Sequence, residues 1–145
     1  MSAQTKEKNL EQDIESFLCS PAGGFLKCDD KHSLLYVEDG TYQMVGGGYM
    51  EHRDRALDAT TLVNFIQTTQ PKAWERFERM CNSDSTAKFA KVFNDAVDRL
   101  GMVAVLKHGF KHRGIPFKVV FFKPESGLNE SAPDRYAKNV CRCIR

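Results

Sequence analysis

The stretch LGMVAVLKHGFKHRGIPFKVVFFKP, Leu100 to Pro124, contains two apolar runs separated by a basic segment. We expect Met102–Leu106 and Phe117–Phe122 to be strands, because continuous apolar runs of this length are typical of strands covered on both faces of an α/β sheet. Pro116 falls near the start of the second run, where a missing backbone donor is tolerated. The stretch therefore predicts two inner strands joined by a positive turn.

The charge of this stretch is one-sided. From Arg99 to Pro124 there are six Lys or Arg and no Asp or Glu, although the whole chain has a net charge of only +2. The six are Arg99, Lys107, Lys111, Arg113, Lys118 and Lys123. Such a cluster suits the phosphates of a DNA backbone, which Lys and Arg neutralise without reading sequence. The alternative is an ordinary solvated turn whose charges discourage edge pairing. His108 and His112 lie in this turn without a third ligand, so no metal site is predicted there.

Three helices are predicted before this stretch, because apolar residues recur there with a helical period. The predicted buried positions are Leu62, Phe65 and Ile66 in the first helix, Trp74, Phe77 and Cys81 in the second, and Phe89, Val92, Phe93, Ala96, Val97 and Leu100 in the third. The boundary residues are Asp58 or Thr60 and Ser85 as N-caps, Pro71 as a first residue and Gly101 as a closing residue.

The N-terminal third predicts a helix and a hairpin. Lys6–Cys19 has an apolar stripe, formed by Leu10, Ile14, Phe17 and Leu18, and ends at Ser20-Pro21. Leu34–Val37 and Tyr42–Val45 pair across a turn that contains Asp39-Gly40. Gly46–Gly48 is interpreted as a flexible loop, because no phosphate-loop motif follows it.

A last helix is predicted from about Asp134, after the polar loop PESGLNESAP. Its basic stripe consists of Arg135, Lys138, Arg142 and Arg145, which bind DNA or form a solvated face. No stop signal follows this helix, and the predicted strands lack partners. We therefore expect the natural protein to continue past Arg145 and to complete the sheet there.

Composition bounds the class of protein. The 145 residues suit one domain, and the 41% hydrophobic and 28% charged fractions are those of a globular chain. The N-terminus has no signal-peptide pattern, and no run reaches the length of a membrane span. The five cysteines are odd in number and fit no zinc pattern. We expect reduced thiols and a cytoplasmic protein.

Four segments together resemble the start of the restriction (R) subunit of type I restriction–modification enzymes. They are NLEQDIESFL, ALDATTLVNFIQTTQPKAW, LGMVAVLKHGFKHRGIPFKVVFFKP and RYAKNVCRCIR. Order and spacing match from about Leu10 to Arg145, least well over residues 25–50. The block from Leu100 to Pro124 with the following Tyr-x-x-Asn, Tyr136 to Asn139, is the most specific part.

The resemblance implies a PD-(D/E)xK nuclease domain followed by superfamily 2 motor domains. The expected fold is α/β, a restriction-endonuclease-like mixed sheet flanked by helices and incomplete in this chain. Residues 1–145 would be the N-terminal portion of the nuclease domain. The parent subunit would use Mg²⁺ and ATP, translocate and cut double-stranded DNA, and join methyltransferase and specificity subunits.

The resemblance also limits the chemistry expected of these residues. The family's catalytic Asp and Glu-x-Lys fall after the Tyr-x-x-Asn helix, beyond this sequence, so the chain alone is predicted to be inactive and to bind neither cofactor tightly. Glu11 falls where the family's first-helix acid lies, and an ordinary solvated carboxylate is the alternative. The DNA-binding candidates are Lys107, Lys111, Arg113, Lys118, Arg135, Lys138 and Arg142. A stand-alone DNA-binding or interaction module that retains this surface remains the alternative function.

Overall fold

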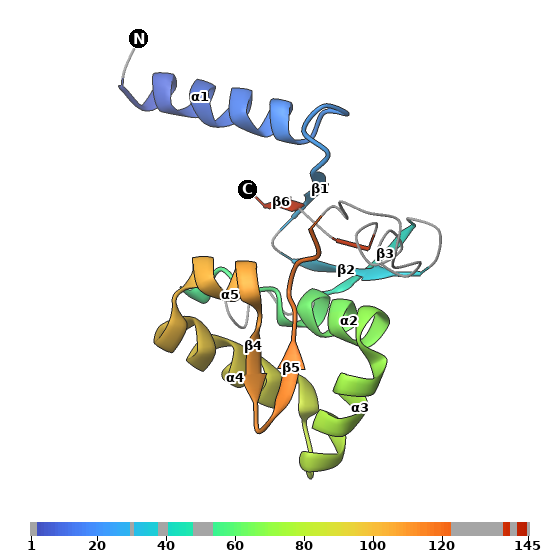
Figure 1. Cartoon of the computed structure of the whole chain (residues 1–145). Coiled ribbons are helices and arrows are strands. Elements are labelled where there is room, and N and C mark those ends of the chain that lie inside the picture. Colours follow the sequence, from blue (N-terminus) through green and yellow to red (C-terminus); the bar gives the residue numbers. More distant parts are fainter. Residues whose placement is uncertain are drawn as a thin grey trace. The chain divides into compact units, whose positions relative to one another are not determined.

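The computed structural model of the chain describes residues 3–29, 31–37, 41–47, 54–122, 138–139 and 142–144. This part of the chain has mixed α/β structure (Figure 1). The helices are α1 (Ala3–Leu18), α2 (Ala59–Thr69), α3 (Pro71–Met80), α4 (Ser85–Leu100) and α5 (Met102–His108). The strands are β1 (Leu26–Cys28), β2 (His32–Tyr36), β3 (Tyr42–Gly46), β4 (Phe110–His112), β5 (Ile115–Phe117) and β6 (Arg142–Ile144). Within these ranges, no helix has both the length and the apolar character needed to cross a membrane.

The chain divides into two compact units. Unit 1 comprises residues 1–30 and 140–145, and unit 2 comprises residues 31–139. Strands pair two by two: β1 with β6 in parallel, and β2 with β3 and β4 with β5 in antiparallel. Two-stranded pairs are marginal alone, so most of the stability must come from helix packing.

Helix α1 confirms the predicted first helix and ends at the predicted break. The Ser20 hydroxyl donates to the Phe17 carbonyl at 2.6 Å, and the Phe25 N–H donates to the Leu18 carbonyl at 2.9 Å. A Cβ atom at Gly23 would lie 2.4 Å from the Leu18 carbonyl oxygen. Only glycine therefore fits where the chain turns back over the helix end.

The apolar face of α1 is left open. Leu10, Ile14 and Phe17 are 61%, 51% and 63% exposed, whereas the buried residue of α1 is Glu15. The Glu15 carboxylate lies 3.0 Å from the Lys27 ammonium. The predicted stripe is therefore present on the helix, but unit 1 does not bury it.

The helix predicted from Asp134 is wrong at its C-terminal end. Residues 142–144 form β6, in which Arg142 lies opposite Leu26 of β1. Lys138 lies in a turn, and residues 123–137, 140, 141 and 145 lie outside the described residues. The Arg-Cys-Ile sequence fits an alternating strand as well as a helix, and β1 supplies the backbone partners. Consequently, the described members of the predicted basic stripe, Lys138 and Arg142, do not share a helix.

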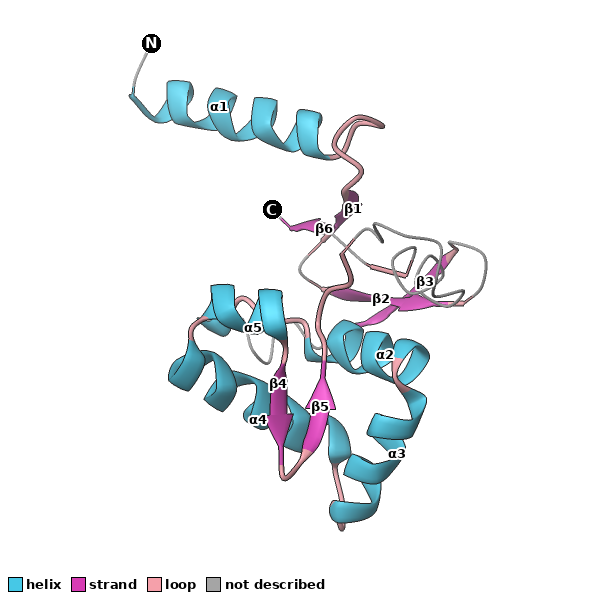
Figure 2. Ribbon diagram, in the orientation of Figure 1, coloured by secondary structure: helices cyan, strands magenta, loops and turns pink. Residues whose placement is uncertain are grey.

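Unit 2 buries an aromatic core. Phe77, Phe89 and Phe117 are at most 2% exposed, and the ring centroids of Phe89 and Phe117 are 5.0 Å apart. Trp74 packs on this cluster as predicted, with its ring centroid 5.6 Å from that of Phe89. The β4–β5 hairpin lies against α4, with α3 beside it (Figure 2). Four helices, α2 to α5, and the β4–β5 hairpin therefore contribute to a single core.

The boundaries of α2, α3 and α4 are close to those predicted. Asp58 caps α2 by accepting from the Thr61 N–H, and Pro71 is the first residue of α3. The N-cap of α4 is Asp84, whose side chain accepts from the Ala87 N–H at 3.2 Å, so the prediction of Ser85 is wrong by one residue. Gly101 ends α4 with φ of 87°, the positive angle that glycine tolerates best.

The strand predicted at Met102–Leu106 is wrong, because these residues lie in α5. Val105 is fully buried, whereas Val103 is 65% exposed and Leu106 is also exposed. Short apolar runs do not distinguish a strand from a helix, and here the helix is closed by Gly109, whose N–H donates to the Val105 carbonyl at 2.8 Å. This run therefore covers the core on one side instead of forming an inner strand.

The basic hairpin is shorter than predicted. Of the strand predicted at Phe117–Phe122, only Phe117 belongs to β5. The loop consists of Arg113 and Gly114, with φ of 47° and 80°. Two positive φ angles in a two-residue loop are the pattern of a type I′ turn, which matches the twist of the flanking strands.

The hairpin predicted near residues 34–45 is confirmed by β2 and β3, and its turn at 38–40 lies outside the described residues. The free edge of β2 is covered by α2. The Leu34 N–H donates to Thr61 Oγ1 at 3.0 Å, and the Tyr36 N–H donates to Asn64 Oδ1 at 2.8 Å. Of the predicted glycine loop, Gly46 ends β3, and Gly48 lies outside the described residues.

Candidate nucleic-acid interface

The β4–β5 hairpin presents its cations from fixed backbone positions. Lys111 is exposed on β4, and Arg113 occupies the first position of the tight loop. Between them, the His112 ring packs edge-on against Phe77, with centroids 5.8 Å apart. The aromatic core therefore anchors the hairpin at its tip.

Helix α4 lies beside the hairpin, and two hollows separate them. The first hollow has a volume of about 270 Å³ and is lined by Phe77, Met80, Cys81, Lys88, Lys91, Val92, His112 and Arg113. The second has a volume of about 170 Å³ and is lined by Val92, Asp95, Ala96, Arg99, Phe110, Lys111 and His112. They share Val92 and His112 and therefore adjoin.

We call this pair of hollows the α4–hairpin groove. Its lining contains five Lys or Arg and one carboxylate, which are Lys88, Lys91, Arg99, Lys111, Arg113 and Asp95. The Lys91 ammonium lies 2.8 Å from Asp95 Oδ2, and the hydrogen bond from Lys91 to Asp95 raises the pKa of Lys91. The one acid in the lining is therefore already paired, and the net charge of the groove is positive.

His112 does not add to that charge at neutral pH. Burial, followed by the positive charge of Arg113, lowers the pKa of His112 below 6.5. The imidazole is therefore neutral at pH 7, and the permanent cations of Lys and Arg dominate the groove.

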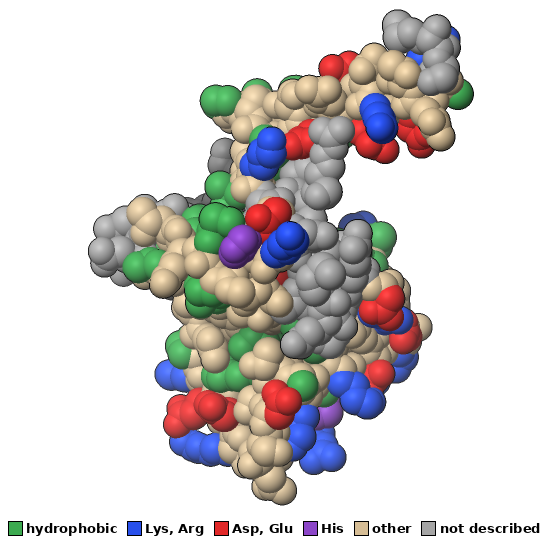
Figure 3. Space-filling model, turned by 180° about the vertical axis from the view of Figure 1, so that it is seen from behind, with side chains coloured by type: hydrophobic (Ala, Val, Ile, Leu, Met, Phe, Trp, Pro, Cys, Tyr) green, Lys and Arg blue, Asp and Glu red, His purple; other side chains and the backbone are tan. Residues whose placement is uncertain are grey.

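The positive charge is local to the groove. On the face of the molecule that Figure 3 shows, Lys and Arg side chains are interspersed with Asp and Glu over the helical part of unit 2. On α3, Arg79 pairs with Glu75, and Arg55 pairs with Asp98 of α4 at 2.7 Å. Such pairs largely cancel charge outside the groove, which agrees with the low net charge of the chain.

The structure brings only some of the predicted DNA-binding residues together. Lys111 and Arg113 lie in the groove, whereas Lys107 lies in the last turn of α5 and lines neither hollow. Lys118 follows β5 and lines a different hollow of about 430 Å³, next to Pro71.

Of the three predicted cations of the C-terminal segment, the structure describes Lys138 and Arg142. The Lys138 ammonium lies 5.5 Å from the centroid of the Tyr36 ring, a cation–π geometry. Arg142 belongs to β6 of unit 1, and Arg135 lies outside the described residues.

Sequence reasoning missed Lys88 and Lys91 as groove residues. A signal was present, because Lys88, Lys91 and Arg99 each precede a residue predicted to be buried on α4. That register places them at the border of the buried stripe, where a flanking element can meet them. The identity of that flanking element, the basic hairpin, is visible only in the structure.

Two side-chain amides hold the segment after β5. The Gln70 side chain bonds both the N–H and the carbonyl of Lys118, each at 2.8 Å. Asn139 does the same for Phe121, accepting from its N–H at 3.0 Å and donating to its carbonyl. An amide side chain carries the donor and acceptor of a peptide group, so it can pair with a backbone as a neighbouring strand does.

The described residues do not provide a cradle for Mg²⁺. Glu11 is exposed on α1, and Glu15 pairs with Lys27. Across the described ranges, no group of three or more His, Cys, Asp or Glu is placed to hold a metal ion. We therefore derive no metal-dependent step from these residues.

Comparison of the chain with protein-family models found no matching family, and comparison with curated proteins and with solved structures found no match. The chemistry of the α4–hairpin groove is thus the best guide to function. Cations from two packed elements, with one paired acid among them, favour an anionic partner.

Proposed function

We propose that the α4–hairpin groove binds the phosphate backbone of double-stranded DNA without reading its sequence. The observation that carries this proposal is the lining of five Lys or Arg against one carboxylate, which is itself paired. Cations so placed displace condensed counterions from DNA, and that release supplies most of the affinity of non-specific binding. Rigid placement on a helix and a tight hairpin lowers the cost of ordering these side chains.

The dimensions of the groove suit a DNA strand. Lys88 and Arg99 are eleven positions apart on α4, which corresponds to about 16 Å along the helix axis. Each strand of B-DNA has one phosphate per about 3.4 Å of axis, so this length covers about five phosphates. Several groove cations can thus contact one strand at the same time.

We further propose that the chain is the N-terminal portion of the nuclease domain of a type I restriction R subunit, with a restriction-endonuclease-like fold. Gln70 and Asn139, which hold the segment after β5, come from two of the segments that carry the resemblance. In this proposal the rest of the subunit supplies DNA cleavage, Mg²⁺ and ATP. Methyltransferase and specificity subunits are its cytoplasmic partners. A stand-alone module, the alternative, would use the same groove.

The test is the salt dependence of binding to a fluorescein-labelled duplex, measured by anisotropy. If all five groove cations contact phosphates, log K falls against log salt with a slope of about −4.5. The double variant Lys111→Gln/Arg113→Asn is expected to make the slope shallower by about two units, because two contacts are lost. Asn is chosen at the loop because it tolerates the positive φ of Arg113.

The matched control is Lys107→Gln/Lys118→Gln, which removes the same charge from the same segment outside the groove. Its slope is expected to stay close to that of the parent protein. Equal slopes for the two double variants would contradict the groove as the interface, and a slope near zero for the parent protein, or no binding at low salt, would contradict binding through phosphates.

A further inference from the structure

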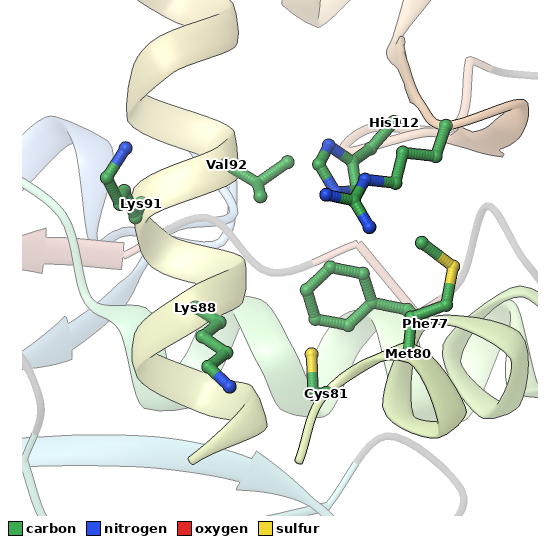
Figure 4. A pocket seen from close by; sticks show the side chains of 8 residues that line it. Phe77, Met80, Cys81, Lys88, Lys91, Val92 and His112 are labelled. Carbon is green, nitrogen blue, oxygen red and sulfur yellow. The ribbon is translucent and has the colours of Figure 1, made fainter. Parts of the chain in front are cut away.

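The first hollow of the groove has the character of a small-ligand site. It lies between the end of α3, the middle of α4 and the hairpin tip (Figure 4). Met80, Val92 and the edge of Phe77 give it an apolar wall, and Cys81 borders it. Its volume of about 270 Å³ is slightly below the range of about 300–1,000 Å³ typical of ligand pockets, so the ligand must be small.

Two of the three Lys and Arg side chains that line this hollow have no ion-pair partner among the described residues. Lys88 and Arg113 form no ion pair with any residue that the structure describes. Lys91 is paired with Asp95, and Figure 4 shows its side chain on the side of α4 away from Phe77. The lining contains no carboxylate. These two cations therefore suit a compact anion, and the planar fork of arginine matches phosphate oxygens well.

We propose that this hollow binds a phosphomonoester that carries a small aromatic or apolar group. The phosphate lies between Lys88 and Arg113, and the organic group lies against Met80 and Val92. This goes beyond the proposed function, because a free phosphomonoester needs no duplex and no second unit of the chain. The source of the phosphomonoester is either a free small molecule or the phosphorylated end of a DNA strand, and the proposal commits to the free molecule.

Cys81 makes the hollow directly testable. It is a half-buried free thiol in the lining, and the half-buried Cys19 of unit 1 serves as an internal control. The rate at which N-ethylmaleimide labels each thiol is measured by peptide mass spectrometry while phenyl phosphate is titrated. The expected result is that phenyl phosphate slows labelling of Cys81 and leaves that of Cys19 unchanged. No protection of Cys81 would overturn the proposal.

Three further ligands decide what is recognised. Benzyl alcohol is expected not to protect Cys81, and inorganic phosphate is expected to protect it only at higher concentration than phenyl phosphate. Equal protection by benzyl alcohol would overturn the role of the cations, and equal protection by inorganic phosphate would overturn the organic part of the ligand. Protection by a 5′-phosphorylated duplex in the absence of any effect of phenyl phosphate would assign the hollow to a DNA end instead.

Charge-removing variants locate the phosphate. Lys88→Gln is expected to raise the half-protecting concentration of phenyl phosphate about tenfold, the equivalent of one charge-assisted hydrogen bond. Arg113→Asn is expected to have a similar effect while keeping the positive φ of the loop. The control Lys107→Gln, which does not line the hollow, is expected to leave that concentration unchanged. If it weakens protection as much as Lys88→Gln does, the effect is one of net charge and the proposal fails.

Discussion

Helices α1 and α4 have the same length and opposite surroundings. Each has 16 residues and an apolar stripe with helical spacing. Helix α4 buries Phe89 and Phe93, whereas α1 buries Glu15 and exposes Leu10 and Phe17. Periodicity therefore predicts that a helix forms and which of its faces is apolar. It does not predict whether another element of the chain packs on that face and buries it.

The difference arises from the segment that comes after each helix. After α4, the chain reverses at Gly101, and α5 and the hairpin pack onto the helix within the next 16 residues. Contacts this close in sequence cost little loop-closure entropy. After α1, the chain reverses at Gly23 into a strand of three residues, and that strand offers Lys27 to Glu15 instead of an apolar surface.

Truncating one phenylalanine on each helix gives the largest expected difference. Phe89→Ala removes the ring at the centre of the aromatic core and is expected to lower the free energy of unfolding by about 3–5 kcal/mol. Phe17→Ala removes an exposed ring and is expected to change it by no more than about 0.5 kcal/mol. Urea titration followed by far-UV circular dichroism measures both, because it reports helices of both units, and the fluorescence of the single tryptophan, Trp74, whose ring contacts Phe89, reports unit 2 by itself.

The milder variant Phe89→Leu keeps this comparison measurable if Phe89→Ala does not fold. It retains most of the buried volume and is expected to lose less stability than Phe89→Ala. A loss at Phe17 as large as that at Phe89→Leu would mean that the α1 stripe is covered in solution, and the contrast between the helices would then be wrong.

The parts predicted correctly are those in which local signals agree. Helices α2, α3 and α4 combine helical periodicity with caps and breakers such as Asp58, Pro71 and Gly101. The core residues Trp74 and Phe77 followed from the same periodicity. Several signals in one segment leave tertiary contacts little to change.

The parts predicted wrongly are short segments whose state depends on distant partners. Met102–Leu106 is apolar enough for an inner strand, but a core already filled by phenylalanine rings leaves room for Val105 alone. The segment at 142–144 becomes β6 because residues 26–28, more than a hundred positions earlier, pair with it. No pattern within so few residues can report such pairing.

The candidate site shows the same division. Lys111 and Arg113 were predicted from one basic segment, and they remain neighbours in the groove. Lys88 enters the site only because α4 packs beside the hairpin, a tertiary fact. Gln70 had no role that its sequence context suggested, because its partner Lys118 lies 48 positions away.

A smaller effect on stability is expected from Gln70, whose side chain holds the backbone directly after the β4–β5 hairpin. Gln70→Ala removes two hydrogen bonds to the Lys118 backbone and is expected to destabilise the protein by about 1 kcal/mol, since both bonds are exposed to solvent. Hydrogen exchange at the Lys118 amide is expected to accelerate. Gln67→Ala, at an exposed position in the last turn of α2, is the control and is expected to change neither quantity.

If the two glutamine variants behave alike, side-chain pairing does not hold the segment after β5. If exchange accelerates only in Gln70→Ala, a contact made from the end of α2 holds the segment after β5. Helix α1 differs in this respect: within the part of the chain that the structure describes, no segment held in this way packs on its apolar stripe, which stays exposed.

The smallest expected effect is the pH dependence that His112 adds to unit 2. Several charged groups line the hollows around its ring: Lys88, Lys91, Asp95 and Arg99 from α4, and Lys111 and Arg113 from the hairpin. Phe77 of α3 packs against the ring itself. The surroundings are therefore apolar and mainly cationic, which agrees with a pKa of His112 that is lowered first by burial and then by Arg113.

Because the pKa of His112 is lower in the folded protein than the unfolded value of about 6.5, the unfolded state binds more protons once the pH falls below that value. Stability is therefore unaffected by His112 above pH 6.5 and decreases as the pH falls toward the folded pKa. We expect His112→Gln to lose less stability than the parent protein between pH 7.5 and pH 5, measured by urea unfolding. His108→Gln, which alters an exposed histidine, should follow the parent protein. If the stability of His112→Gln has the same pH dependence as that of the parent protein, protonation of His112 does not weaken the contact between the hairpin and the core.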